Sequence, residues 1–130
     1  MIAFLMYINS ENRFLSDYCH KKRNNMNEEL IPLQVVKNES TFRFELNVDG
    51  YIAFIDYKQE DDIIKLIHTE VPEELGGRGV AAALVEKTLV YLEEHKNPLF
   101  PYCPYVYAYI KKHPEWKRIV HPKFSNYNEL

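Results

Sequence analysis

The sequence predicts one α/β domain of the α+β kind, built around a mixed, mostly antiparallel twisted sheet, and three observations lead to this class. Short apolar segments typical of strands fill residues 33–71, a glycine-rich turn follows at residues 76–79, and apolar residues with helical spacing begin directly after it. A length of 130 residues and a hydrophobic content of 46% suit a single domain with a sizeable core.

Four strands are expected before the glycine turn. Residues 41–48 alternate apolar and polar side chains with a period of two, as a half-buried strand does. Asp49 and Gly50 predict a two-residue hairpin turn, because both central positions of such a turn favour positive φ. Residues 59–62 predict a second turn, and the mostly apolar strand after it is expected inside the sheet. The strands of this antiparallel meander are expected at residues 33–37, 41–48, 51–58 and 63–71.

Two helices and a short strand are expected after the meander. Apolar residues recur at helical spacing from residue 78 to residue 94. The prolines within residues 97–103 indicate an extended piece at a sheet edge. Pro104 suits the first position of a second helix, which ends at His113 because the next residue is Pro114. Residues 115–120 are expected to form a helical turn.

Both ends of the chain differ from the domain, which is expected to cover residues 31–120. For residues 1–30 two interpretations stay open: translation naturally begins at Met26, or an amphipathic helix precedes the domain. Residues 121–130 are polar and predict a loose tail.

Composition argues against several classes of protein. The net charge of −3 and the pI near 5.9 argue against binding nucleic acid through a basic surface. Cys19 and Cys103 lie far apart without a CxxC spacing, which predicts no zinc site and no disulfide scaffold. No apolar run approaches the length of a membrane span, and the N-terminal apolar segment lacks a cleavage site. We therefore expect a cytoplasmic protein without a metal, a membrane or a nucleic acid as partner.

Four short motifs follow one another in the second half of the chain. They are H-T-E-V-P at residues 68–72, G-x-G-x-A at residues 77–81, P-x-C-P-Y-V at residues 101–106 and Y-I-x-x-H-P at residues 109–114. With the order of the elements, they make the chain resemble the GNAT superfamily of acyl-CoA-dependent N-acyltransferases, and within it a compact single-domain branch. The first marked position of the superfamily's glycine turn falls on Gly76, and Arg78 lies two positions later.

The resemblance implies acetyl-CoA as co-substrate, and the residues agree with that. Glycines before a helix bring bare backbone N–H groups to its positive end, which is a ready-made phosphate site. The resemblance also implies that the backbone near Thr69 and Val71 pairs with the pantetheine amides. Lys111 is a candidate for the 3′-phosphate, although a solvated helix end explains it equally well. The expected phosphate-binding residues are Gly76, Gly77, Arg78, Gly79, Val80, Ala81 and Ala82.

Four residues are candidates for catalysis. Glu70 and His68 alternate along one strand, so either can take a proton from an amine. Cys103 precedes a helix, whose dipole favours a thiolate that accepts the acyl group or, as the thiol, protonates the departing CoA. Tyr107 is a candidate general acid. Structural alternatives stay open: a hydrogen bond for Glu70, a core or cleft position for His68 and an inert buried thiol for Cys103.

These features predict an N-acyltransferase that moves an acetyl group from acetyl-CoA to a primary amine. The acceptor is expected to be a protein lysine, an N-terminus or a small amine. The alternatives are a CoA-binding sensor without efficient catalysis and a protein-interaction domain that has kept only the fold.

Overall fold

The computed structural model describes residues 26–130 of a chain that divides into two compact units, Met1–Pro32 and Leu33–Leu130. In the first unit, the described residues contain one 3-10 turn, η1 (Glu28–Leu30). The expectation of an amphipathic N-terminal helix falls on residues 1–25, outside the described residues, and the start at Met26 stays a prediction. The predicted site residues all belong to the second unit.

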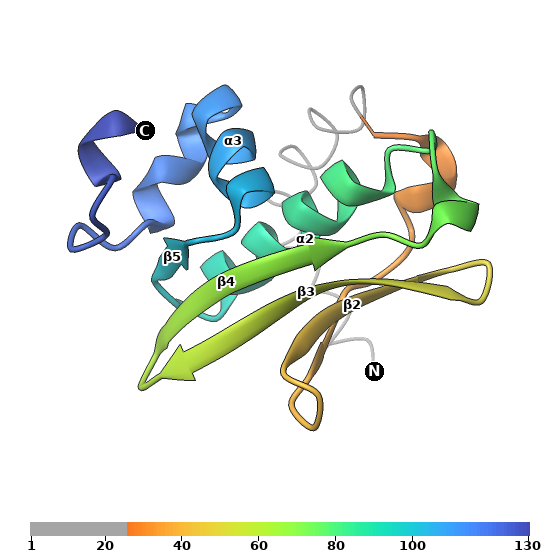
Figure 1. The fold of residues 1–130 in the computed structure, drawn as a ribbon, viewed down its shortest axis with the longest axis horizontal. Helices are drawn as coiled ribbons and strands as arrows, with labels where there is room; N and C mark the ends of the chain where they lie inside the picture. Colours follow the sequence, from red (N-terminus) through yellow and green to blue (C-terminus); the bar gives the residue numbers. More distant parts are fainter. Residues whose placement is uncertain (1–25) are drawn as a thin grey trace, which may run out of the picture. The chain divides into compact units, whose positions relative to one another are not determined.

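The second unit has the expected order of four strands, a glycine turn, a helix, a strand and a helix (Figure 1). Its sheet has the order β1-β2-β3-β4-β5, with antiparallel pairing from β1 to β4 and parallel pairing between β4 and β5. The predicted fold class is therefore confirmed. The elements are β1 (Val36–Asn38), β2 (Arg43–Val48), β3 (Tyr51–Glu60), β4 (Ile63–Glu70), η2 (Glu73–Leu75), α2 (Val80–Glu94), β5 (Leu99–Pro101), α3 (Pro104–Lys112), η3 (Pro114–Ile119) and η4 (Tyr127–Glu129).

The boundaries differ from the predicted ones where local patterns were weak. The first strand is shorter and begins at Val36, and the first long helix begins at Val80 because Gly79 is in the left-handed conformation. β3 continues to Glu60, so the second turn is shorter than predicted. The hairpin at Asp49 and Gly50 is confirmed, with φ values of 53° and 86°.

The core lies between one face of the sheet and α2, which runs along the sheet in Figure 1. The ring of Phe44 on β2 lies 5.4 Å from the ring of Tyr91 on α2, centroid to centroid. Removing these side chains from water supplies most of the driving force for folding. Fully buried residues of this core include Phe44, Leu46, Ala53, Ile55, Ile64, Leu66, Leu84, Val85 and Leu89.

The C-terminal tail is more ordered than its polar sequence predicts. Phe124 is only 6% exposed, and its ring lies 6.1 Å from Phe100 on β5 and 5.6 Å from Tyr102. A single aromatic residue in a polar segment is a weak signal in sequence, but its burial attaches the tail to the domain.

Candidate functional site

A β-bulge in β4 decides which way the H-T-E residues face. Leu66 pairs with Tyr57 of β3, whereas His68 pairs with the preceding residue, Asp56, so Ile67 is an inserted residue. A bulge shifts the alternation of side chains by one position. Thr69 therefore lies on the same face as its buried partner Ile55, and His68 lies on the opposite, exposed face.

Beyond the bulge, β4 and β5 separate into a fork. The parallel pairing ends at Leu66 and Pro101, and the backbone N–H of Cys103 donates to the Leu66 carbonyl at 2.8 Å. β4 then continues to Glu70, while the other chain turns into α3 at Pro104. Thr69 lies on the β4 arm of this fork, and Cys103 lies where the arms separate. The predicted pairing of substrate amides with exposed strand backbone requires such a separation.

Cys103 and Thr69 meet on the inner side of the fork. The Cys103 Sγ lies 3.2 Å from the Thr69 Oγ1, and Cys103 is 3% exposed. The thiol is at the N-cap of α3, as predicted, but in the described part of the chain it makes no capping hydrogen bond. The hydroxyl of Thr69 is thus a neighbour of the proposed reactive thiol. The H-T-E pattern contains no signal for a bulge. Sequence reasoning therefore did not predict the contact between Thr69 and Cys103.

His68 and Glu70 lie on one exposed face of the sheet, as expected. His68 stands opposite Asp56, whose Oδ1 accepts a hydrogen bond from Arg43 Nε at 2.9 Å. Glu70 stands opposite Phe54, and the guanidinium carbon of Arg43 lies 3.8 Å from that ring's centroid. The two candidate bases and the candidate thiol therefore lie on opposite faces of β4.

The glycine turn leaves the start of α2 open. Gly77 and Gly79 have φ values of 77° and 72°, which L side chains rarely adopt. A Cβ added to either would meet no atom of residues 26–130 within 4 Å. Within the described residues, no side chain caps this end of the helix, and its first turn holds no acidic residue. Open space before a helix N-terminus, with small Ala81 and Ala82 behind it, fits a pyrophosphate.

The Arg78 side chain, which was predicted to bind a phosphate, forms an ion pair with Asp49. Its Nη1 lies 2.9 Å from Oδ2 of Asp49, at the tip of the β2–β3 hairpin. The Asp49 side chain is 68% exposed, so this ion pair adds little stability. It does fasten the glycine turn to the hairpin, and it leaves backbone N–H groups as the main phosphate donors.

Tyr107 and Lys111 lie on the side of α3 that faces the tail. The Tyr107 hydroxyl donates to Glu129 Oε2 at 3.3 Å. Burial, followed by the negative charge of Glu129, raises the pKa of Tyr107 above its ordinary value. The Lys111 ammonium lies 5.8 Å from the centroid of the Tyr107 ring. A catalytic role for Tyr107 and a phosphate contact for Lys111 stay predictions.

A buried carboxylate explains part of the Y-I-x-x-H-P motif. Glu86 of α2 is 4% exposed, and its Oε1 accepts hydrogen bonds from the Tyr109 hydroxyl at 2.6 Å and from Trp116 Nε1 at 3.1 Å. Desolvation, with the hydrogen bond and charge of Glu86, strongly raises the pKa of Tyr109. The tyrosine stays protonated and acts as a donor that joins α2 to α3. Sequence reasoning missed Glu86 because it reads as an exposed helix residue.

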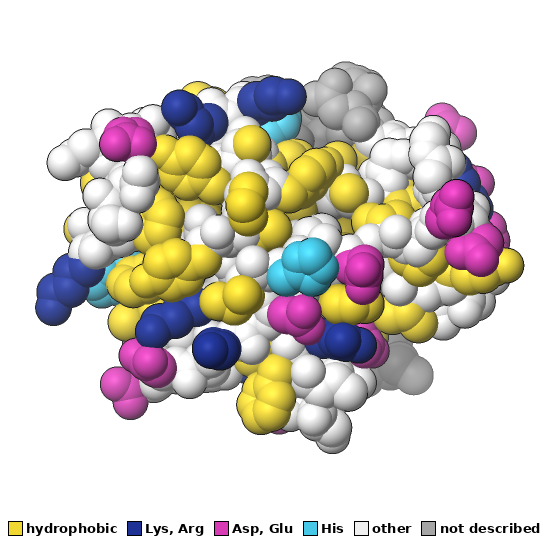
Figure 2. All heavy atoms as spheres, viewed as in Figure 1, with side chains coloured by type: hydrophobic (Ala, Val, Ile, Leu, Met, Phe, Trp, Pro, Cys, Tyr) yellow, Lys and Arg dark blue, Asp and Glu magenta, His cyan; other side chains and the backbone are white. Residues whose placement is uncertain are grey.

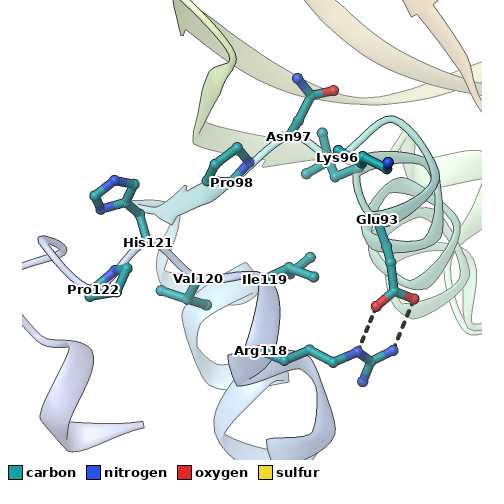
Figure 3. A pocket seen from close by; sticks show the side chains of 10 residues that line it. Glu93, Lys96, Asn97, Pro98, Arg118, Ile119, Val120, His121 and Pro122 are labelled. Carbon is teal, nitrogen blue, oxygen red and sulfur yellow. Dashed lines mark hydrogen bonds and ion pairs between the residues drawn. The ribbon is translucent and has the colours of Figure 1, made fainter.

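A cavity of about 300 Å³ lies at the other end of α2 (Figure 3). Its wall includes an ion pair in which Nε and Nη2 of Arg118 donate to the Glu93 carboxylate, with Nη2 at 2.9 Å from Oε1. None of the predicted site residues lines it. The lining residues are Leu92, Glu93, Lys96, Asn97, Pro98, Arg118, Ile119, Val120, His121 and Pro122.

The described part of the chain offers neither a metal site nor a membrane-spanning helix. No three His, Cys, Asp or Glu side chains among residues 26–130 gather closely enough to hold a metal ion. In the same range, no helix combines the length and the apolar character that crossing a membrane requires.

The family follows from a comparison with known proteins. The model of the GCN5-related N-acetyltransferase domain matches residues 43–119, from β2 to the end of η3. The chain belongs to this family. The match includes the bulge, the fork and the glycine turn, so the family's common core contains the candidate site.

Two relatives agree with this assignment. Protein NATD1 of Gallus gallus is 29% identical over 91 residues, which cover 67% of this chain and 82% of the relative. Protein NATD1 of Mus musculus is 36% identical over 87 residues, which cover 64% of this chain and 78% of the relative.

Proposed function

We propose that this member of the GCN5-related N-acetyltransferase family transfers the acetyl group of acetyl-CoA to a primary amine, such as a protein lysine, an N-terminus or a small amine. The observation that carries the proposal is the combination of a β4–β5 fork, an open glycine turn and a thiol where the fork's arms separate. In the reaction, the amine nitrogen bonds to the acetyl carbon, the C–S bond breaks, the amine loses a proton, and CoA leaves as a thiol.

The backbone would do most of the binding. N–H groups at residues 77–82 would hold the pyrophosphate, aided by the helix dipole. The predicted donor at Gly76 is left out, because its N–H already donates to the Glu73 carbonyl at 3.0 Å. The free edge of β4 near Thr69 and Val71 would pair with the pantetheine amides. Glycine at position 79 suits this role, because its backbone reaches a left-handed φ without placing a side chain in the cradle.

The side chains of the fork offer two routes for the proton and the acyl group. Cys103 would either accept the acetyl group as a thiolate or donate its proton to the departing CoA sulfur. Glu70, or His68 beside it, would take the proton from an amine that approaches from the exposed face of the sheet. A role for a base on that face requires the thioester to pass through the fork, since Cys103 lies on the other side.

This separation of Cys103 from the candidate bases favours one specific alternative. If the acyl group stays on the inner side, no candidate base lies close to it, and the chain would bind CoA without efficient transfer. Turnover distinguishes this CoA-binding sensor from an enzyme.

Calorimetry with CoA and acetyl-CoA tests the binding step. Gly79→Glu adds bulk and negative charge to the cradle, so we expect wild-type binding to fall by about 100-fold or more. Lys96→Glu is the control, because it places a carboxylate at the other end of the same helix, and we expect it to bind normally. If the folded wild type binds neither ligand, the proposal is wrong.

Transfer is then measured against a panel of amines. A Cys103→Ala variant with full turnover would exclude both roles of the thiol. An acetyl adduct on Cys103, detected by mass spectrometry after incubation with acetyl-CoA alone, would identify the covalent route.

A further inference from the structure

Residues 120–130, which we call the strap, close the outer edge of the sheet. Val120 bridges Leu99 in parallel, and the backbone N–H of His121 donates to the Leu99 carbonyl at 2.9 Å. The strap thus occupies the side of β5 that β4 does not cover. Its residues lie beyond the part of the chain that the family model matches, which ends at residue 119. The strap is therefore an addition to the matched core.

Phe124 attaches the strap to the residues around Cys103. Its ring contacts Tyr102, directly before the cysteine, at 5.6 Å, and Tyr107, one helical turn after it, at 6.1 Å. The Tyr107 N–H donates to the Cys103 carbonyl at 2.9 Å, so this tyrosine is fixed to the same turn as the thiol. Figure 2 shows hydrophobic side chains gathered over the β5 and α3 part of the visible face.

Two further contacts hold the end of the strap. Glu129 accepts the hydrogen bond of the Tyr107 hydroxyl, and the Lys117 ammonium lies 4.6 Å from the centroid of the Tyr127 ring. These groups are largely or partly exposed. Exposed polar contacts contribute little free energy each, so burial of the Val120 and Phe124 side chains is the main force that holds the strap.

We propose that the strap is a specificity-determining segment of the acyltransferase, and that it forms the wall of the acceptor site on the Tyr102 side of the fork. This inference rests on the proposed function. Tyr102 is 50% exposed beside the buried Cys103, so an acceptor that reaches the thiol from this side would meet the tyrosine ring first. Phe124 holds that ring in place by an edge-on contact, and the strap thereby shapes the surface that the acceptor meets.

The test is Phe124→Ala, with Lys123→Ala as an exposed control on the same strap. Phe124→Ala frees Tyr102, so we expect the KM for the amine to rise by about tenfold while the KM for acetyl-CoA stays unchanged. Lys123→Ala should change neither. Because the proposed effect passes through Tyr102, Phe124→Ala should have much less effect in a Tyr102→Ala background.

Other outcomes would overturn the inference. Equal changes in both KM values, or a lower melting temperature with normal KM values, would mean that Phe124 only stabilises the fold. Hydrogen exchange at the Tyr107 amide separates this inference from the proposed function. Exchange should accelerate in Phe124→Ala, and unchanged exchange contradicts the strap's role even if the wild type transfers no acetyl group.

Discussion

Both ends of α2 carry a residue in the left-handed conformation, yet the two ends differ in how their backbone groups are hydrogen-bonded. Gly79 precedes the first turn with φ of 72°, and Lys96 follows the last turn with φ of 56°. At the C-terminal end, the N–H of Lys96 donates to the Glu93 carbonyl, and the N–H of Asn97 donates to the Leu92 carbonyl. This is a Schellman motif, in which the chain satisfies its own helix end.

The N-terminal end has no equivalent closure among the described residues. No side chain of residues 26–130 caps it, and the glycines leave open space in front of it within that range. The cavity of Figure 3 lies instead at the satisfied end, where Arg118 neutralises Glu93. The presence of a cavity alone therefore does not identify the ligand-binding site. A helix start that no described side chain caps, with open space at Gly77 and Gly79, favours the glycine turn as the place where an anionic ligand binds.

The largest expected effect is at the open end. Gly79→Val combines a β-branched side chain with a φ of 72° and places methyl groups in the proposed cradle. We expect the affinity for CoA to fall by about 30-fold or more, with a loss of unfolding free energy of about 1–2 kcal/mol. Calorimetry and denaturant unfolding measure the two effects. Normal affinity in the folded variant would remove the distinction between the two ends.

The same backbone conformation at the closed end predicts the opposite result. Lys96→Gly relieves a left-handed non-glycine residue, so we expect the free energy of unfolding to rise by about 0.5–1 kcal/mol. The affinity for CoA should not change. Thermal unfolding with and without CoA checks both statements, and weaker CoA binding would point to the cavity as the ligand site.

The smallest effect concerns the ion pair in the cavity wall. Glu93→Gln removes one charge of a pair whose side chains are 36% and 46% exposed, so solvent screens most of their interaction. We expect a loss of at most about 1 kcal/mol at low salt, decreasing as salt is added. Denaturant unfolding at two salt concentrations measures it. A larger loss, independent of salt, would show a structural role that the exposed geometry does not predict.

The sequence predicted those parts of the fold that local chemistry determines. The hairpin at Asp49 and Gly50, the helix that starts with Pro104 and the order of the elements depend on turn residues and periodicity, which a sequence displays directly. The position of Cys103 directly before α3, and that of the glycine turn directly before α2, follow from the same local signals.

The features that the sequence did not predict depend on contacts between residues far apart in the chain. Strict alternation would have put Leu66 and His68 on one face, but the inserted Ile67 turns His68 outward and brings Thr69 to Cys103. The ion pair between Arg78 and Asp49 joins residues 29 positions apart, and no local pattern indicates it. Likewise, the burial of Phe124 depends on rings from β5 and α3.

The most direct test of the central claim is an amide NMR titration of the isotope-labelled full chain with CoA. The account predicts that resonances of residues 77–82 and 67–71 shift together, while those of Lys96, Asn97 and residues 119–121 do not. Shifts confined to the second group would place the ligand in the cavity at the satisfied end of α2 and contradict the account.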